Sequence, residues 1–106
     1  MAGLEYTFAR VPIAGSDFST HPYTYDDDHD GDFALDFFAL APEDLQYKIP
    51  QLKEALGMSD RPIRLLASSW SAPTWMKTNE DFVGKGSLKG EPGGEYYQTW
   101  ANYYVR

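Results

Sequence analysis

The chain has 106 residues, of which 42% are apolar and 16% aromatic, a composition typical of one globular domain or of a part of a larger one. Its 16 acidic and 9 basic residues give a net charge of −7. This charge argues against binding to nucleic acid or to an anionic membrane surface, because both depend on lysine and arginine. The absence of cysteine excludes disulfide scaffolds, thiolate zinc sites and cysteine nucleophiles.

The first predicted element is a buried strand over residues 4–14, LEYTFARVPIA, which is rich in aromatic and β-branched residues and which Pro12 helps to end. Arg10 is unusual in this setting. A guanidinium in apolar surroundings is costly unless a carboxylate pairs with it. We therefore expect Arg10 either to reach water or to face an acidic cluster.

Residues 20–40 form a long predicted loop that contains the aspartate-rich stretch YDDDHDGDFALD. Asp26, Asp28, Asp30 and Gly31 match the opening of a calcium-binding loop, which needs oxygen ligands at positions 1, 3 and 5 and glycine at position 6. Position 12 is Phe37, where such loops carry a bidentate glutamate. A solvated, mobile acidic loop is therefore the favoured interpretation, with calcium binding as the alternative.

A helix is predicted over residues 41–57, with Pro42 at its first position and Gly57 at its end. Pro50 lacks an N–H group and predicts a kink or break near Ile49. A second short strand, residues 63–68, follows Pro62. Strand, helix and strand make a βαβ unit with parallel strands, so the predicted fold class is α/β.

A last helix begins after the glycine-rich loop over residues 78–94, and its predicted apolar face contains Tyr97, Trp100, Ala101 and Tyr104. This helix has no stop signal before Arg106. Two strands with their helices would also leave open sheet edges and an uncovered aromatic face. We therefore expect the chain to be a fragment of a larger α/β protein.

Polar and aromatic residues follow both predicted strands, at the end of a parallel sheet where α/β proteins place their chemistry. Asp17 lies in the first of these loops and Trp70 in the second. A carboxylate accepts hydrogen bonds from neighbouring sugar hydroxyls, and an indole packs against the C–H face of a sugar ring. These residues predict a sugar pocket, although Trp70 and Trp75 could instead pack the loop and Asp17 could cap its own turn.

Two further motifs are weak. The stretch GKGS at residues 84–87 lacks the first glycine and the Ser or Thr after lysine that a phosphate-binding loop requires. His21 and His29 have no spacing typical of zinc ligands, so we expect both to be surface histidines.

Three stretches, RVPIAGSDFS, LLASSWSAPTWMKTN and GKGSLKGEPGGEYYQTWANYYV, resemble the glucosylceramidases of glycoside hydrolase family 30. The resemblance covers almost the whole chain. It implies a fragment of a (β/α)8 TIM barrel, about two to three βα units, so residues 1–106 would be a partial catalytic domain truncated at both ends. It also implies a retaining β-glucosidase that hydrolyses glucosylceramide to glucose and ceramide, in sphingolipid metabolism, without a metal or other cofactor. A lysosomal location, a saposin activator and acidic phospholipids are implied for the whole enzyme, and nucleic acid is not a partner.

The resemblance assigns Asp17 and Trp70 as hydrogen-bonding residues for the glucose hydroxyls, and Arg10 as a barrel-interior cation near the catalytic carboxylates. Retaining hydrolysis uses two carboxyl groups about 5–5.5 Å apart, an acid/base and a nucleophile. The family carries both on later strands, the first in an Asn-Glu-Pro motif, so we expect no catalytic residue in this chain and no activity from it alone. Glu80 follows Asn79 but precedes Asp81 instead of proline, and we assign it no catalytic role.

Three alternatives to a glucosylceramidase remain. A member of the same family could hydrolyse another β-linked glycan, as a glucanase or xylanase does. The chain could be a non-catalytic carbohydrate-binding module that uses its tryptophans as a platform. The acidic loop could be a calcium-tuned interaction segment.

Overall fold

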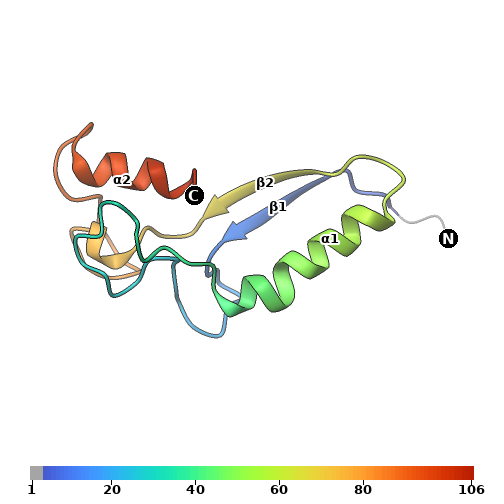
Figure 1. Cartoon of the computed structure of the whole chain (residues 1–106), viewed down its shortest axis with the longest axis horizontal. Helices are drawn as coiled ribbons and strands as arrows, with labels where there is room; N and C mark the ends of the chain where they lie inside the picture. The colour runs from blue at the N-terminus through green and yellow to red at the C-terminus, as the bar shows by residue number, and fades with distance from the viewer. Residues whose placement is uncertain (1–3) are drawn as a thin grey trace.

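The computed structural model describes residues 4–106, which form an elongated molecule with two parallel strands at its centre (Figure 1). Strand β1 (Phe8–Ile13) pairs with β2 (Arg64–Ser69), with Phe8 opposite Arg64 and Ile13 opposite Ser69. The helical segment between them runs back alongside the strands, as a parallel connection requires. The α/β class and the parallel βαβ unit predicted from the sequence are confirmed. No described helix is long and apolar enough to cross a bilayer.

Strand β1 is shorter than predicted, and Pro12 lies inside it, opposite Ser68, instead of ending it. A proline removes one backbone donor, which an edge strand tolerates when that donor would face away from its partner. Within residues 4–106, β2 is the only neighbour of β1. Pro12 is therefore compatible with the pairing of β1 and β2.

The connecting helix begins with α-helical residues at Pro42 and Glu43, widens into the π-helix η1 (Asp44–Lys48) and continues as α1 (Ile49–Met58). The change from π to α falls at Ile49, where the sequence predicts a break. Pro50 has no N–H to donate to the preceding turn, and a wider π turn accommodates such a missing bond. The helix ends one residue after Gly57, at Met58.

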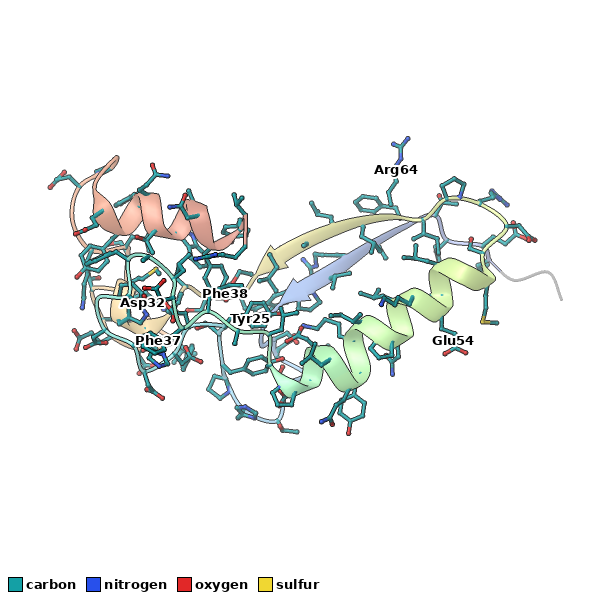
Figure 2. The ribbon with its side chains drawn as sticks, viewed as in Figure 1. Tyr25, Asp32, Phe37, Phe38, Glu54 and Arg64 are labelled. Carbon is teal, nitrogen blue, oxygen red and sulfur yellow. The ribbon has the colours of Figure 1, made fainter. Side chains whose placement is uncertain are left out.

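Most of the core lies beyond the C-terminal ends of the strands, in a region that we call the loop lobe (residues 14–41 and 70–106, Figure 1). It contains the short 3₁₀ helix η2 (Thr74–Met76) and α2 (Glu95–Tyr103). Figure 2 shows Tyr25 and Phe38 close together in this lobe, whereas Glu54 and Arg64 point outward from α1 and β2. The buried apolar residues are Ala14, Tyr25, Leu35, Ala72, Trp75, Met76 and Tyr103.

Aromatic pairs hold the loop lobe together. Phe38 meets Tyr103 edge-on with ring centroids 5.0 Å apart, and Phe33 meets Trp75 in the same way at 5.6 Å. Such edge-to-face pairs contribute about 0.5–1.5 kcal/mol each beyond the area that they bury. Loop residues thus build most of the buried core, whereas β1 is largely half-buried and β2 is mostly exposed.

The buried face of α2 differs from the predicted one. Thr99 and Tyr103 are buried and Tyr96 and Trp100 pack partly against the core, whereas Ala101 and Tyr104 are exposed. Helical periodicity predicted the helix correctly, but the buried face is shifted by about one residue toward the N-terminus relative to the predicted face. The difference arises because Tyr103 is held by a specific polar contact as well as by its ring.

That contact supplies a testable prediction. The buried backbone N–H of Tyr25 donates to the hydroxyl of Tyr103 at 3.0 Å. Tyr103→Phe leaves this N–H without an acceptor, so we expect the free energy of unfolding to fall by about 1–3 kcal/mol in urea titrations. Tyr47→Phe, at an exposed position, is the control and should change it little. Equal effects of the two substitutions would show that the contact does not stabilise the lobe.

Candidate functional site

The loop after β1 turns sharply before it reaches Asp17. Gly15 donates its N–H to the carbonyl of Tyr23 at 3.1 Å, and a Cβ at this position would lie 3.0 Å from that carbonyl oxygen. Only glycine fits so close to another backbone segment without displacing it. Next along the chain, the hydroxyl of Ser19 accepts from the N–H of Ser16 at 2.9 Å. Serines therefore cap this loop, and the alternative role of Asp17 as a capping residue is not observed.

The start of this loop is also tied to η1. Lys48 donates to the carbonyl oxygens of Pro12 at 3.0 Å and Ala14 at 3.3 Å, and it forms an ion pair with Asp44 at 2.8 Å. Asp44 is buried and also accepts from the hydroxyl of Tyr25 at 2.6 Å. This network fixes the end of β1, from which the Asp17 loop departs.

The loop after β2 places its two tryptophans in different environments. Trp75 is 4% exposed, and its indole N–H donates to the carbonyl of Asp26 at 2.9 Å, so it packs the loop. Trp70 is 45% exposed, and the structure gives its indole N–H no acceptor among residues 4–106. Of the two, only Trp70 is available to a ligand.

Arg10 lies against Trp70. Its guanidinium carbon is 4.9 Å from the centroid of the indole, within the range of a cation–π interaction. Arg10 is exposed and forms no ion pair with a carboxylate within the described residues. Of the two expectations for this residue, contact with water fits the structure, and the expected acidic partner is not found in residues 4–106.

Asp17 and Trp70 line the same cavity, which has a volume of about 250 Å³. The side chain of Asp17 has no hydrogen-bond partner in the described part of the chain and is exposed. Tyr23 and Pro22 form one side of the cavity, and burial, followed by the carboxylates of Asp44 and Glu43, raises the pKa of the Tyr23 hydroxyl. The full lining consists of Gly15, Ser16, Asp17, Pro22, Tyr23, Trp70, Ser71, Phe82 and Val83.

This lining combines an unpaired carboxylate, an accessible indole and serine hydroxyls with an apolar wall. Such a combination can hold a ligand that has hydroxyl groups on its edges and C–H groups on its faces. Asp17 and Trp70 are therefore brought together in one cavity, whereas Arg10 does not line it and contacts it only through the Trp70 ring. Their roles toward a sugar stay predictions.

Phe82 and Val83, which form an apolar wall of the cavity, were not predicted from the sequence. The signal was two apolar residues within an otherwise polar, glycine-rich loop. Glu80, two residues earlier, forms an exposed ion pair with Lys89 at 2.8 Å and does not line the cavity. The GKGS stretch lies in the same loop, where Gly86 lies against the amide of Asn79.

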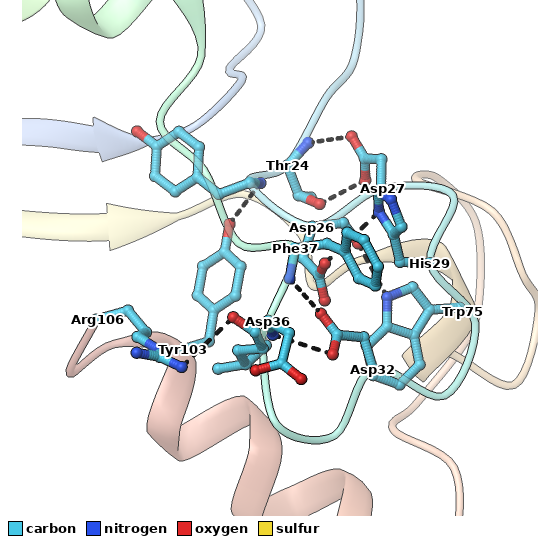
Figure 3. A network of polar contacts seen from close by, with 12 residues as sticks. Thr24, Asp26, Asp27, His29, Asp32, Asp36, Phe37, Trp75, Tyr103 and Arg106 are labelled. Atoms are coloured by element: carbon cyan, nitrogen blue, oxygen red, sulfur yellow. Dashed lines mark hydrogen bonds and ion pairs between the residues drawn. The ribbon is translucent and has the colours of Figure 1, made fainter.

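The expectation of a solvated acidic loop fits only part of the stretch: Asp28, Asp30 and Asp36 are exposed, whereas other residues of the loop pack into the core. Asp26 is 1% exposed, and Tyr25 and Leu35 are buried beside it. The aspartates hold the loop in shape: Asp32 accepts from the N–H groups of Asp36 at 3.0 Å and Phe37 at 2.9 Å (Figure 3). Local carboxylate bonds of this kind compensate for backbone donors that no helix or strand would satisfy.

Asp26 and His29 form an unusual pair within this loop. His29 stacks on Phe37 with ring centroids 4.3 Å apart, and its Nδ1 lies 3.8 Å from a carboxylate oxygen of Asp26. It is therefore half-buried instead of lying free on the surface. His21, by contrast, is exposed as expected. No group of three acidic or histidine side chains within residues 4–106 is arranged to hold a metal ion.

Comparison with known proteins extends this picture. The Glycosyl hydrolase family 30 TIM-barrel domain matches residues 1–106. The chain is 55% identical over 104 residues to lysosomal acid glucosylceramidase of Mus musculus, covering 98% of this chain and 20% of that protein. It is 30% identical over 115 residues to an endo-1,6-beta-D-glucanase of Trichoderma harzianum, covering 99% and 23%. The solved structure of SrfJ from Salmonella typhimurium is similar with a TM-score of 0.74 and 35% identity, over 94% of this chain and 22% of that one.

A parallel βαβ unit whose polar loops gather at the C-terminal ends of the strands is the arrangement of TIM-barrel enzymes. The chain belongs to glycoside hydrolase family 30. It spans about a fifth of the length of the curated relatives that it matches.

Proposed function

We propose that this chain is part of a retaining β-glucosidase that hydrolyses glucosylceramide to glucose and ceramide. The observation that carries the proposal is the single cavity shared by Asp17 and Trp70, two residues from separate strand ends. The 55% identity to a lysosomal acid glucosylceramidase supports the choice of substrate. Residues 1–106 then form one part of a TIM-barrel catalytic domain.

Each residue of the site has a distinct role in this proposal. The carboxylate of Asp17 accepts hydrogen bonds from glucose hydroxyls, because it has no partner within the described residues. Trp70 presents its exposed indole to the sugar. Arg10 holds that indole by the cation–π contact at 4.9 Å and adds positive charge near the reacting carboxylates.

The chemistry itself is assigned to two carboxyl groups outside these residues. Retaining hydrolysis needs an acid to protonate the leaving oxygen and a nucleophile to attack the anomeric carbon, about 5–5.5 Å apart. The cavity contains one carboxylate, Asp17, and Glu80 lies outside it. The chain by itself is therefore expected to be inactive.

The same site could serve another β-linked glycan. A 1,6-glucanase relative at 30% identity favours this second candidate, and xylan is a further substrate of that kind. A non-catalytic carbohydrate-binding module remains a third reading of the same cavity. A lysosomal location is proposed by resemblance to the mouse relative, and a saposin activator and acidic phospholipids are proposed as partners of the complete enzyme. The net charge of −7 argues that other parts of the protein contact such lipids.

The test compares substrates on the full-length protein. We expect release of glucose from fluorescent glucosylceramide, with kcat/KM at least about tenfold above that for a β-1,6-glucan or xylan, a difference of about 1.4 kcal/mol in transition-state binding. Preference for either polysaccharide would replace the proposal by the second candidate. Saturable sugar binding without hydrolysis of any of the three would support the binding module.

A further inference from the structure

One side chain joins two walls of the cavity without lining it. The ammonium group of Lys77 donates to the hydroxyl of Ser71 at 3.3 Å and to the carbonyl oxygens of Asp81 at 2.5 Å and Phe82 at 3.1 Å. An ammonium has three N–H donors, so these contacts use its full capacity. Within residues 4–106 Lys77 has no ion-pair partner. Its contacts are therefore those of a structural clamp and not of a surface salt bridge.

The two ends of this clamp are parts of the cavity wall. Ser71 directly follows Trp70, and Phe82 with Val83 forms the apolar wall beside it. Lys77 lies at the base of the loop that carries Phe82, where it pairs with Leu88 in an isolated antiparallel bridge. The contacts of Lys77 thus connect the base of this loop to Phe82, which lines the cavity.

Lys77 is the side chain that ties this loop to the Trp70–Ser71 segment. Residues 80–87 are mostly exposed and include Gly84 and Gly86, which leave the backbone free to adopt several conformations. Other contacts of this segment are at its two ends, where Glu80 pairs with Lys89 at 2.8 Å and the carbonyl of Ser87 accepts from the N–H of Thr78 at 2.8 Å. Within the loop, the amide of Asn79 donates to the carbonyl of Val83 at 2.8 Å. Without Lys77, the carbonyl groups of Asp81 and Phe82 would lose their donor.

We propose that Lys77 is a positioning residue, which sets the width of the cavity by holding the Phe82–Val83 wall against the Trp70–Ser71 loop. What enters the cavity rests on the proposed function, whereas the clamp itself does not. An open wall leaves the sugar and the group attached to it with fewer contacts at one side. Binding weakens, while the reacting carboxylates keep their geometry.

The first test uses steady-state kinetics of the full-length protein with a soluble aryl β-glucoside. Lys77→Met keeps the length of the side chain and removes its donors, and we expect KM to rise about tenfold with kcat changed less than about twofold. Lys85→Met, at an exposed lysine of the same loop, is the matched control and should leave both constants unchanged. A Lys77→Met enzyme with wild-type KM, or with kcat lowered as much as kcat/KM, would overturn the proposal.

A double-mutant cycle between Lys77 and Phe82 distinguishes a positioning role of Lys77 from a general loss of stability. Phe82→Ala should raise KM on its own, and Lys77→Met should add little in the Phe82→Ala background, because both remove the same wall. Fully additive effects on KM would contradict the proposal. If Lys77→Met fails to fold, Lys77→Gln in the same pair of backgrounds carries the same criterion.

Hydrogen exchange distinguishes failure of the clamp from failure of the proposed function. Amides of residues 80–86 should exchange faster in Lys77→Met than in the wild type, with residues 95–103 unchanged as an internal control. A wild-type protein that does not cleave the glucoside would reject the glucosidase proposal, and exchange would still decide on the clamp. Unchanged exchange in residues 80–86 would reject the clamp even in an active enzyme.

Discussion

Replacing Trp70 by alanine in the full-length protein is expected to lower kcat/KM for a β-glucoside by about 100-fold. The change removes the exposed indole from the cavity wall and takes away the surface on which Arg10 rests. Loss of a large aromatic contact is worth about 1.5–3 kcal/mol, and about 2.7 kcal/mol corresponds to the stated factor. The measurement is steady-state hydrolysis at matched enzyme concentration, together with a melting curve to show that the fold persists.

Two further substitutions locate the source of the effect. Trp70→Phe keeps an aromatic face for the sugar and for Arg10, so we expect it to recover most of the activity. Tyr47→Ala removes an exposed ring from the helical connection, outside the cavity lining, and should be neutral. A Trp70→Ala enzyme within threefold of the wild type would show that the sugar binds elsewhere.

The stability of the loop lobe should increase as the pH falls from neutral toward 5. Asp26 is buried, and its two carboxylate oxygens have no hydrogen-bond donor in the described structure. Burial and then the neighbouring Asp32 carboxylate raise the pKa of Asp26 from 3.8 to about 7, while His29 opposes the shift. Asp32 differs: burial opposes ionisation there too, but the N–H groups of Phe37 and Asp36 lower its pKa. At neutral pH Asp26 therefore holds a proton more readily than the neighbouring Asp32.

The direction of this change in stability with pH follows from the number of protons that the folded and unfolded states bind. The folded lobe holds a proton on Asp26 at pH values where the unfolded chain has lost it, so folding takes up a proton between about pH 4 and 7. The stabilising contribution is complete below the pKa of the unfolded chain and is lost as the pH rises through about 7. Asp32, with its lowered pKa, works in the opposite direction below about pH 4, where its protonation releases the two amides.

Asp26→Asn tests this account, because asparagine fills the same space without a charge and can donate to Asp32. At pH 7.5 we expect the variant to have a free energy of unfolding about 2 kcal/mol above the wild type, and at pH 5 an advantage of less than about 1 kcal/mol. Urea unfolding of the full-length protein at both pH values measures the difference. Asp28→Asn, at an exposed aspartate of the same loop, should change stability equally little at either pH. An advantage of Asp26→Asn that is the same at both pH values would contradict a titrating buried carboxyl.

The parts of the fold that could be predicted from the sequence are those with a repeating pattern. Apolar and β-branched runs located both strands, and the connecting helix implied that they are parallel. Pro50 marked the change of helix geometry at Ile49 because a missing N–H acts locally, whatever surrounds it. In each case the determining chemistry lies within a few residues of its effect.

The acidic loop and the face of α2 could not be predicted because they depend on partners far away in the chain. Tyr103 is drawn inward by the N–H of Tyr25, 78 residues earlier. The carbonyl of Asp26 accepts from the indole N–H of Trp75, and this contact accompanies the burial of Asp26 within an otherwise partly exposed acidic loop (Figure 3). Charge and hydropathy alone place such a stretch in solvent, since they contain no information on a distant donor.

The candidate site likewise contains residues that could be placed from the sequence and residues that could not. Asp17 and Trp70 could be placed together from the sequence because the C-terminal ends of parallel strands meet at one edge of a sheet. Phe82 could not be placed there, because its position depends on the Lys77 clamp across a glycine-rich loop. Arg10 was identified as unusual, but its partner is the Trp70 ring and not an acidic cluster within these residues.

The most direct test of the site is a crystal structure of the full-length protein with a glucose-configured inhibitor. We predict that the sugar lies in the cavity between Asp17 and Trp70, with a hydroxyl within about 3 Å of the Asp17 carboxylate, an ordinary hydrogen-bond distance, and with the indole in contact with the sugar. A sugar bound elsewhere, with this cavity empty and Asp17 facing solvent, would contradict the account.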